Sequence, residues 1–132
     1  MDKLFDVVII GAGPAGLAAG LYAGRSRLST LIIEREKDGG QIAQTAEIDN
    51  YPGSVEGETG PSLVERFSAQ TQKFGAEKVI DTVTDMELEG NPKKIIGQKE
   101  TYLGKTVILA GGAVLTKIGC PGEEEFTGKG VS

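Results

Sequence analysis

The sequence has 132 residues, of which 39% are hydrophobic and 25% are charged, with a net charge of −5. This composition predicts one soluble globular domain, because the chain can bury a real core but is too short for two full domains. An acidic balance without a cluster of Lys and Arg argues against nucleic-acid binding, and no apolar run approaches the roughly 20 residues that span a bilayer. The start of the chain lacks the pattern of a secretory signal, so the expected location is cytoplasmic.

The first predicted elements form a strand, a glycine-rich turn, a helix and a second strand. Residues 4 to 10 are an apolar, β-branched run without alternation, as in a strand buried on both faces of a parallel sheet. The turn at residues 11 to 16 follows, and apolar residues then recur at helical spacing until Gly24. Residues 29 to 34 are a second buried strand. This order predicts a Rossmann-type opening with parallel strands.

A long irregular segment and a second helix come next. Residues 35 to 58 carry charge, Gly, Asn and Pro with little periodicity, which is typical of functional loops. The helix is expected to begin near Gly60, with Ser62 and Glu65 as a capping box, and to end near Gly75.

The remaining elements complete a sheet. Residues 78 to 80 read as a third parallel strand, residues 83 to 103 as a small antiparallel meander, and residues 106 to 110 as the fourth parallel strand. We therefore predict an α/β fold whose parallel sheet has the order 3-2-1-4, with helices on one face and the meander on the other. Residues 1–113 are predicted to form this domain, and residues 114–132 are predicted to form a surface connector.

The glycine turn is the main candidate site, and it comprises Gly11, Ala12, Gly13, Pro14, Ala15 and Gly16. In such a turn the first glycine allows the sharp bend, the second lets a pyrophosphate approach, and the third lets the helix pack on the strand. The helix amino terminus then stabilises the anion. Glu34, about 20 residues after Gly13, ends the second strand where a carboxylate accepts ribose hydroxyls, and its charge disfavours NADP.

These residues leave alternatives open. A glycine-rich strand-helix turn beside a solvated Glu34 has no need of a ligand, and the turn by itself does not separate FAD from NAD. Asn50 is as well suited to an Asx turn before Tyr51 as to a cofactor contact. The chain has no His and one cysteine, Cys120, which reads as a structural residue. We therefore predict no metal site and no catalytic residue.

Six segments together resemble the low-molecular-weight thioredoxin reductases and the flavoprotein subunit of alkyl hydroperoxide reductase. They are VIIGAGPAGLAAGLYAGRSRL, GGQ at 39 to 41, IDNYPG at 48 to 53, KFGAE, VILAGGA and PGEEEFTGKGVS. The resemblance implies that the glycine turn and Glu34 hold the ADP part of FAD. It implies further contacts from Gly40, Gln41, Thr45 and Asn50 near the ribityl chain and isoalloxazine, from Val83 near adenine, and from Ala110, Gly111 and Gly112 near the dinucleotide.

The resemblance also implies a function. In that family electrons pass from NADPH through FAD to a disulfide on a partner such as thioredoxin, and the enzyme is expected to be a homo-oligomer. The chain would supply a partial FAD site, incomplete at its carboxy-terminal end, while the NADPH domain and a Cys-x-x-Cys pair would lie in an absent part. The chain alone is expected to be inactive. The alternative is a non-enzymatic module that binds an adenine dinucleotide or a partner protein and is complete as it stands.

Overall fold

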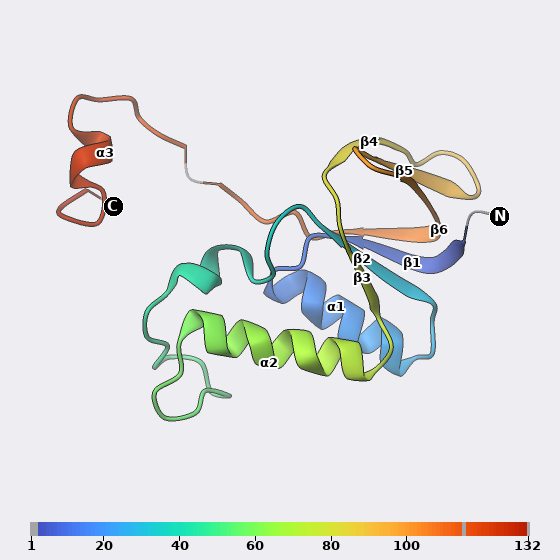
Figure 1. Cartoon of the computed structure of the whole chain (residues 1–132), viewed down its shortest axis with the longest axis horizontal. Helices are drawn as coiled ribbons and strands as arrows, with labels where there is room; N and C mark the ends of the chain where they lie inside the picture. Colours follow the sequence, from blue (N-terminus) through green and yellow to red (C-terminus); the bar gives the residue numbers. More distant parts are fainter. Residues whose placement is uncertain (1–2, 115, 132) are drawn as a thin grey trace.

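A six-stranded mixed sheet carries two long helices against one of its faces (Figure 1). The computed structural model describes residues 3–114 and 116–131. The strands are β1 (Leu4–Ile10), β2 (Thr30–Glu34), β3 (Glu77–Ile80), β4 (Val83–Glu87), β5 (Lys93–Gly97) and β6 (Thr101–Leu109). The helices are α1 (Pro14–Arg25), α2 (Gly60–Lys73), the short α3 (Glu123–Phe126) and the 3₁₀ helix η1 (Gly40–Gln44).

The parallel strands form the centre of the sheet, whose full order is β3-β2-β1-β6-β5-β4. β1 pairs in parallel with β2 on one side and with β6 on the other, and β2 pairs in parallel with β3. The predicted order 3-2-1-4 is confirmed, because β6 contains the strand expected at residues 106 to 110. The carboxyl ends of β1, β2 and β6 therefore meet at one edge of the sheet.

β6 differs from its predicted form, because the meander and the fourth parallel strand are not separate. It is one strand of 9 residues, which pairs antiparallel with β5 at its start and parallel with β1 afterwards. Gly104 belongs to both ladders, opposite Phe5 of β1 and Lys93 of β5. A Cβ on Gly104 would lie 2.8 Å from Cγ2 of Val8, so the glycine allows close strand packing here instead of breaking the strand.

Two apolar cores lie on opposite faces of the sheet. On the helix side, Val7, Ile9 and Ile32 pack with Leu17 of α1 and Val64 of α2. On the other face a second cluster joins the central strands to the meander, and its buried members are Phe5, Val8, Leu31, Ile33, Ile95 and Tyr102. The prediction of helices on one face and the meander on the other is thus confirmed. Each fully buried aliphatic side chain contributes about 1.5–3 kcal/mol.

The capping box of α2 lies three residues before the predicted one. Thr59, and not Ser62, is the N-cap: its hydroxyl accepts from the Ser62 amide at 3.2 Å, and the Ser62 hydroxyl accepts from the Thr59 amide at 2.9 Å. The helix begins at Gly60, where it was predicted to begin, and Pro61 lies in its first turn, where a backbone donor is not needed. Ser62 therefore serves as the third residue of the helix, and Glu65 has no part in the cap.

The segments outside the sheet and the two long helices are short or irregular. Within residues 35 to 58, which we predicted to be irregular, the chain forms η1. α3 lies apart from the sheet and from both long helices (Figure 1). Among the described residues, no helix has the length and apolar character that crossing a membrane would need.

We expect the 132-residue chain to self-associate through the outer edge of β6. Within the described parts of the chain, no strand pairs with this edge beyond Gly104, and Leu109 is 61% exposed. Because an unpaired apolar edge recruits other strands, light scattering should detect dimers or larger species. Leu109→Lys should restore the monomer, whereas Ile118→Lys, at a side chain that is 85% exposed outside the sheet, should not. A monodisperse monomer at high concentration would contradict this prediction.

Candidate functional site

The glycine turn begins where β1 ends, at the edge that collects the carboxyl ends of the central strands. Gly11 has a φ of +102°, which favours glycine, and its amide donates to the Ile33 carbonyl at 2.8 Å. A Cβ at Gly11 would lie under 3.0 Å from the Ala110 carbonyl oxygen, so no other residue fits without movement of β6. The turn is therefore packed tightly between β2 and the end of β6.

The second and third glycines of the turn face different surroundings. A Cβ on Gly16 would overlap the Gly11 carbonyl oxygen, far inside the 3.0 Å limit of real contacts, so Gly16 allows α1 to pack on the turn. A Cβ on Gly13 would meet no atom within 4 Å. Gly13 is the N-cap of α1 and has no side-chain cap, and Pro14 occupies the first turn with Ala15. The amino end of α1 therefore presents backbone donors towards open space.

Glu34 lies directly beside the turn. One carboxylate oxygen accepts from the Ala12 amide at 2.7 Å, and the other accepts from the amides of Arg35 at 2.9 Å and Glu36 at 3.2 Å. Ala12 itself is fully buried. These three donors hold the carboxylate at the end of β2 in a fixed orientation next to the amino end of α1.

The loop after β2 returns to the same turn. The Gly39 amide donates to the Ala12 carbonyl at 2.8 Å. Both Gly39 and Gly40 have positive φ, at +109° and +56°, and a Cβ on Gly40 would lie 3.8 Å from Cα of Gly13. Gly40 therefore lies beside the open side of the turn.

The end of β6 closes the other side. The Ala110 amide continues the pairing with β1, and the amide side chain of Gln41 donates to the Ala113 carbonyl at 2.8 Å. Gly111 and Gly112 are exposed, and a Cβ on either would meet no atom within 4 Å. The structure thus brings the glycine turn, Glu34, Gly40, Gln41 and the 110–112 segment together.

Val83 lies on the other side of Glu34, at the start of β4. The Asp81 amide donates to the Glu34 carbonyl at 2.9 Å, so the chain passes next to the backbone of Glu34 between β3 and β4. Two residues later Val83 is partly buried against the second core. The carbonyl of Thr82 accepts from the Gln98 amide at 3.0 Å, which fixes this crossover to the β5–β6 turn.

A buried carboxylate that sequence reasoning missed holds this crossover. Asp81 is 2% exposed, and its oxygens accept from the Tyr102 hydroxyl at 2.9 Å and from the amides of Thr82, Lys99 and Glu100. Burial raises the pKa of Asp81, but these hydrogen bonds outweigh it and leave the pKa below its ordinary value. Burial and the neighbouring carboxylate raise the pKa of Tyr102 to about 12. No local spacing in the sequence indicates this pair.

Thr45 and Asn50 lie in the segment between β2 and α2, after Gly40 and Gln41. Thr45 ends η1, and its carbonyl accepts from the Gly60 amide at 2.9 Å at the start of α2. Both side chains are exposed, and the hydrogen bonds of the described residues join neither of them to residues 11 to 16. The hydrogen bonds of the described residues therefore do not link these two candidates to the glycine turn, although Thr45 caps η1, the helix that begins with Gly40 and Gln41.

The loop that carries Asn50 is closed by a second buried carboxylate, Glu58, which sequence reasoning also missed. The Ile48 amide donates to the Glu58 carbonyl at 2.9 Å, and the Glu58 carboxylate, 1% exposed, pairs with the Ser62 hydroxyl and the Arg66 guanidinium. The Ser62 hydrogen bond and the Arg66 charge lower the pKa of Glu58 against the effect of burial. The loop from residue 48 to 58 is thus a closed unit against α2.

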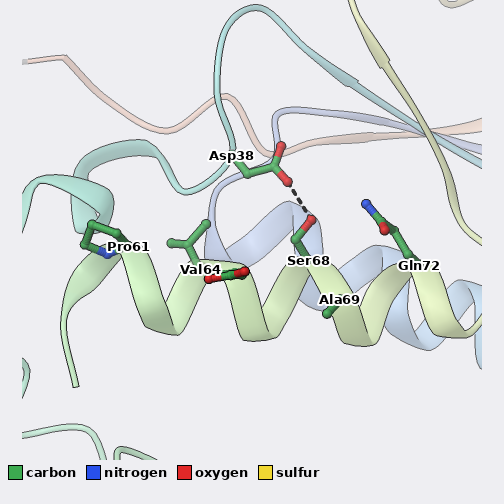
Figure 2. A pocket seen from close by; sticks show the side chains of 7 residues that line it. Asp38, Pro61, Val64, Ser68, Ala69 and Gln72 are labelled. Carbon is green, nitrogen blue, oxygen red and sulfur yellow. Dashed lines mark hydrogen bonds between the residues drawn. The ribbon is translucent and has the colours of Figure 1, made fainter. Parts of the chain in front are cut away.

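An open groove of about 410 Å³ lies along α2, next to the loop that returns to the glycine turn (Figure 2). It is lined by Asp38, Pro61, Val64, Glu65, Ser68, Ala69 and Gln72. Ser68 donates to Asp38 at 2.7 Å across the groove. None of the lining residues belongs to the glycine turn, so this groove is separate from the candidate site.

The fold and the turn define the class of the protein: an α/β domain with a strand-turn-helix unit of the type found in dinucleotide-binding folds, at the carboxyl edge of its parallel strands. The model of the pyridine nucleotide-disulphide oxidoreductase family matches residues 5–132. The chain belongs to this family.

Relatives and solved structures of this family resemble the chain over nearly its whole length. The chain is 55% identical to a thioredoxin reductase of Peptoclostridium acidaminophilum over 132 residues, which are all of this chain and 42% of that protein. It resembles the crystal structure of Lactococcus lactis thioredoxin reductase with a TM-score of 0.85 and 44% identity, over 97% of this chain and 42% of that one. A glucosaminate ammonia-lyase of Pseudomonas fluorescens is 42% identical over 126 residues, 96% of this chain and 39% of that protein. The chain therefore spans about two fifths of the length of these relatives.

Proposed function

We propose that the chain binds the ADP half of FAD. The observation that carries this proposal is the open space in the Cβ direction of Gly13, at the amino end of α1 that no side chain caps, one residue after Ala12, whose amide holds the Glu34 carboxylate. A pyrophosphate in this space would accept hydrogen bonds from backbone amides, and the ribose would donate to Glu34. A larger residue at Gly13 would fill the space that this binding needs.

The rest of the dinucleotide would extend to both sides of the turn. We assign the adenine to the side of Val83, and the ribityl chain and isoalloxazine to the side of Gly40, Gln41 and the 110–112 segment. Thr45 and Asn50 remain in this proposal on the family resemblance alone. FAD, when bound, supplies the hydride and electron chemistry. The residues of this chain bind and orient it, and we assign none of them a role as acid or base.

The wider function that we propose is electron transfer from NADPH through FAD to a disulfide of a thioredoxin-like partner, in a cytoplasmic homo-oligomer. The names of the relatives support this reaction. The ammonia-lyase name shows that similarity over this segment does not by itself decide the reaction. We assign the NADPH site and the redox cysteine pair to other parts of the enzyme, because the single Cys120 offers no partner within this sequence.

Glu34→Ala should weaken the binding of both FAD and ADP by about ten- to a hundredfold, because a hydrogen bond to a charged group contributes roughly 1.5–3 kcal/mol. Titration calorimetry on the 132-residue chain measures both affinities. Glu36→Ala is the matched control, since the Glu36 side chain is 78% exposed and should leave both affinities unchanged. The affinities of Glu34→Gln should lie between those of Glu34→Ala and those of the unsubstituted chain, because the amide oxygen keeps part of the contact. Equal affinities of Glu34→Ala and the unsubstituted chain would contradict the proposal that the ribose donates to Glu34.

A further inference from the structure

Asp38 ties the loop after β2 to two other elements. Its carboxylate accepts from the Ser68 hydroxyl of α2 at 2.7 Å and from the Lys78 ammonium of β3 at 2.6 Å. The side chain of Asp38 is 12% exposed and that of Lys78 is 26% exposed, so this ion pair is shielded from water far better than a surface pair. Figure 2 shows Asp38 reaching down from the loop to Ser68.

The residues that follow Asp38 need such an anchor. Gly39 and Gly40 both adopt the left-handed region and have no side chains of their own to fix them. A Cβ on Gly39 would lie 2.5 Å from Cγ2 of Val64, so the loop lies close against α2 at this point. The next contact is the hydrogen bond from the Gly39 amide to the Ala12 carbonyl in the glycine turn.

We propose that Asp38 is a positioning residue for the flavin end of the dinucleotide. Held by α2 and β3, it sets Gly40 against Gly13 and brings Gln41 within reach of Ala113. The inference rests on the proposed function, because it takes Gly40 and Gln41 as the start of the ribityl and isoalloxazine side. Asp38 acts through the loop and touches no reacting atom.

This role predicts a selective effect. The ADP half is assigned to the glycine turn and Glu34, and the side chain of Asp38 contacts neither of them. Asp38→Ala should therefore weaken FAD binding by about tenfold, the effect of losing roughly 1.4 kcal/mol, and change ADP binding by less than about twofold. At saturation, the fluorescence anisotropy of bound FAD should fall, because the flavin end moves while the ADP end stays held.

The experiment measures FAD and ADP affinities by calorimetry, flavin anisotropy, and the thermal stability of the ligand-free chain. Ser68→Ala removes one hydroxyl and keeps the ion pair, so it tests the anchor even if Asp38→Ala fails to fold, and should weaken FAD binding by about threefold. Asp38→Asn keeps the shape and an acceptor oxygen for Ser68 but loses the charge that pairs with Lys78, so its FAD affinity should lie between that of Asp38→Ala and that of the unsubstituted chain. Asp85→Ala, at an exposed carboxylate whose side chain accepts from the Met86 amide next to it, is the matched control.

The outcomes are distinct. A loss of FAD affinity and anisotropy with unchanged ADP affinity supports the positioning role. If Asp38→Ala and Ser68→Ala weaken FAD and ADP equally, or weaken neither, the inference is overturned while the proposed function stands. If the unsubstituted chain binds neither ligand, the proposed function fails and the inference fails with it.

Discussion

Gly13→Val should abolish dinucleotide binding and leave the domain folded, whereas Gly16→Val should unfold it. The backbone of Gly13 has φ −71° and ψ 180°, which any residue adopts, and its Cβ direction is open. A valine there costs the fold little but occupies the space assigned to the pyrophosphate. We expect the affinity for ADP to fall by at least about a hundredfold, roughly 2.7 kcal/mol.

At Gly16 the same substitution meets backbone. Its first added carbon would overlap the Gly11 carbonyl oxygen, and that oxygen is fixed because Gly11 is packed between β2 and the end of β6. The clash can be relieved only if α1 moves away from the sheet, which opens the core around Leu17. Overpacking usually costs about 1–3 kcal/mol, and we expect more here because the obstacle is backbone rather than a side chain.

Circular dichroism with thermal denaturation separates the two variants, and calorimetry with ADP measures binding. Gly90→Ala is a control for glycine replacement outside the site, since Gly90 is exposed between β4 and β5 and a Cβ there would meet a single atom within 4 Å, the Pro92 carbonyl oxygen at 3.3 Å. A Gly13→Val chain that binds ADP as well as the unsubstituted chain would refute the pyrophosphate assignment. A Gly16→Val chain with an unchanged melting temperature would refute the packing argument.

The glycine turn could be predicted from sequence because local rules coincide there. Residues 4 to 24 contain a buried strand, three glycines with set spacing and a helical repeat, and together these form one strand-helix unit. The strand order followed, because a right-handed crossover leaves few ways to arrange four parallel strands. The continuity of β6 was missed because the meander was predicted to end at residue 103 and the fourth parallel strand to begin at residue 106, whereas Gly104 between them packs closely against Val8 within one strand.

The anchors around the site could not be predicted in the same way. Asp81 and Tyr102 are 21 positions apart, and Asp38 and Lys78 are 40 positions apart. A charged residue in a loop is usually solvated, so nothing local marks these carboxylates as buried. The contacts of Asp81 depend on the crossover from β3 to β4 and on the turn before β6, and the Asp38–Lys78 pair depends on the loop after β2 lying against α2 and β3. These arrangements exist only once the sheet and its helices have formed. The burial of Glu58 in its closed loop likewise has no local signal, because it depends on the loop folding against α2.

Tyr102→Phe should lower the melting temperature by about 5–10 °C near neutral pH, because it removes a hydrogen bond to a buried carboxylate. Asp81→Asn should lower it further, since the amide cannot accept from all the donors that now converge on the carboxylate. Tyr22→Phe is the matched control, because Tyr22 is 63% exposed. An unchanged melting temperature of Tyr102→Phe would contradict a structural role for the pair.

The pH dependence gives the sharper test of the same pair. The pKa of Asp81 is lower in the folded chain than in the unfolded one, so its contribution to stability is present above the ordinary value of about 3.9 and is lost as the pH falls through the folded pKa. The pKa of Tyr102 is raised to about 12, so its contribution is full below its ordinary value of about 10 and is lost as the pH rises towards 12. Denaturation at a series of pH values measures the free energy of unfolding of both chains. The difference in this free energy between the unsubstituted chain and Tyr102→Phe should therefore become smaller at both the acid and the alkaline extremes. A gap that stays constant across the whole range would exclude a charged Asp81 as the acceptor of the Tyr102 hydroxyl.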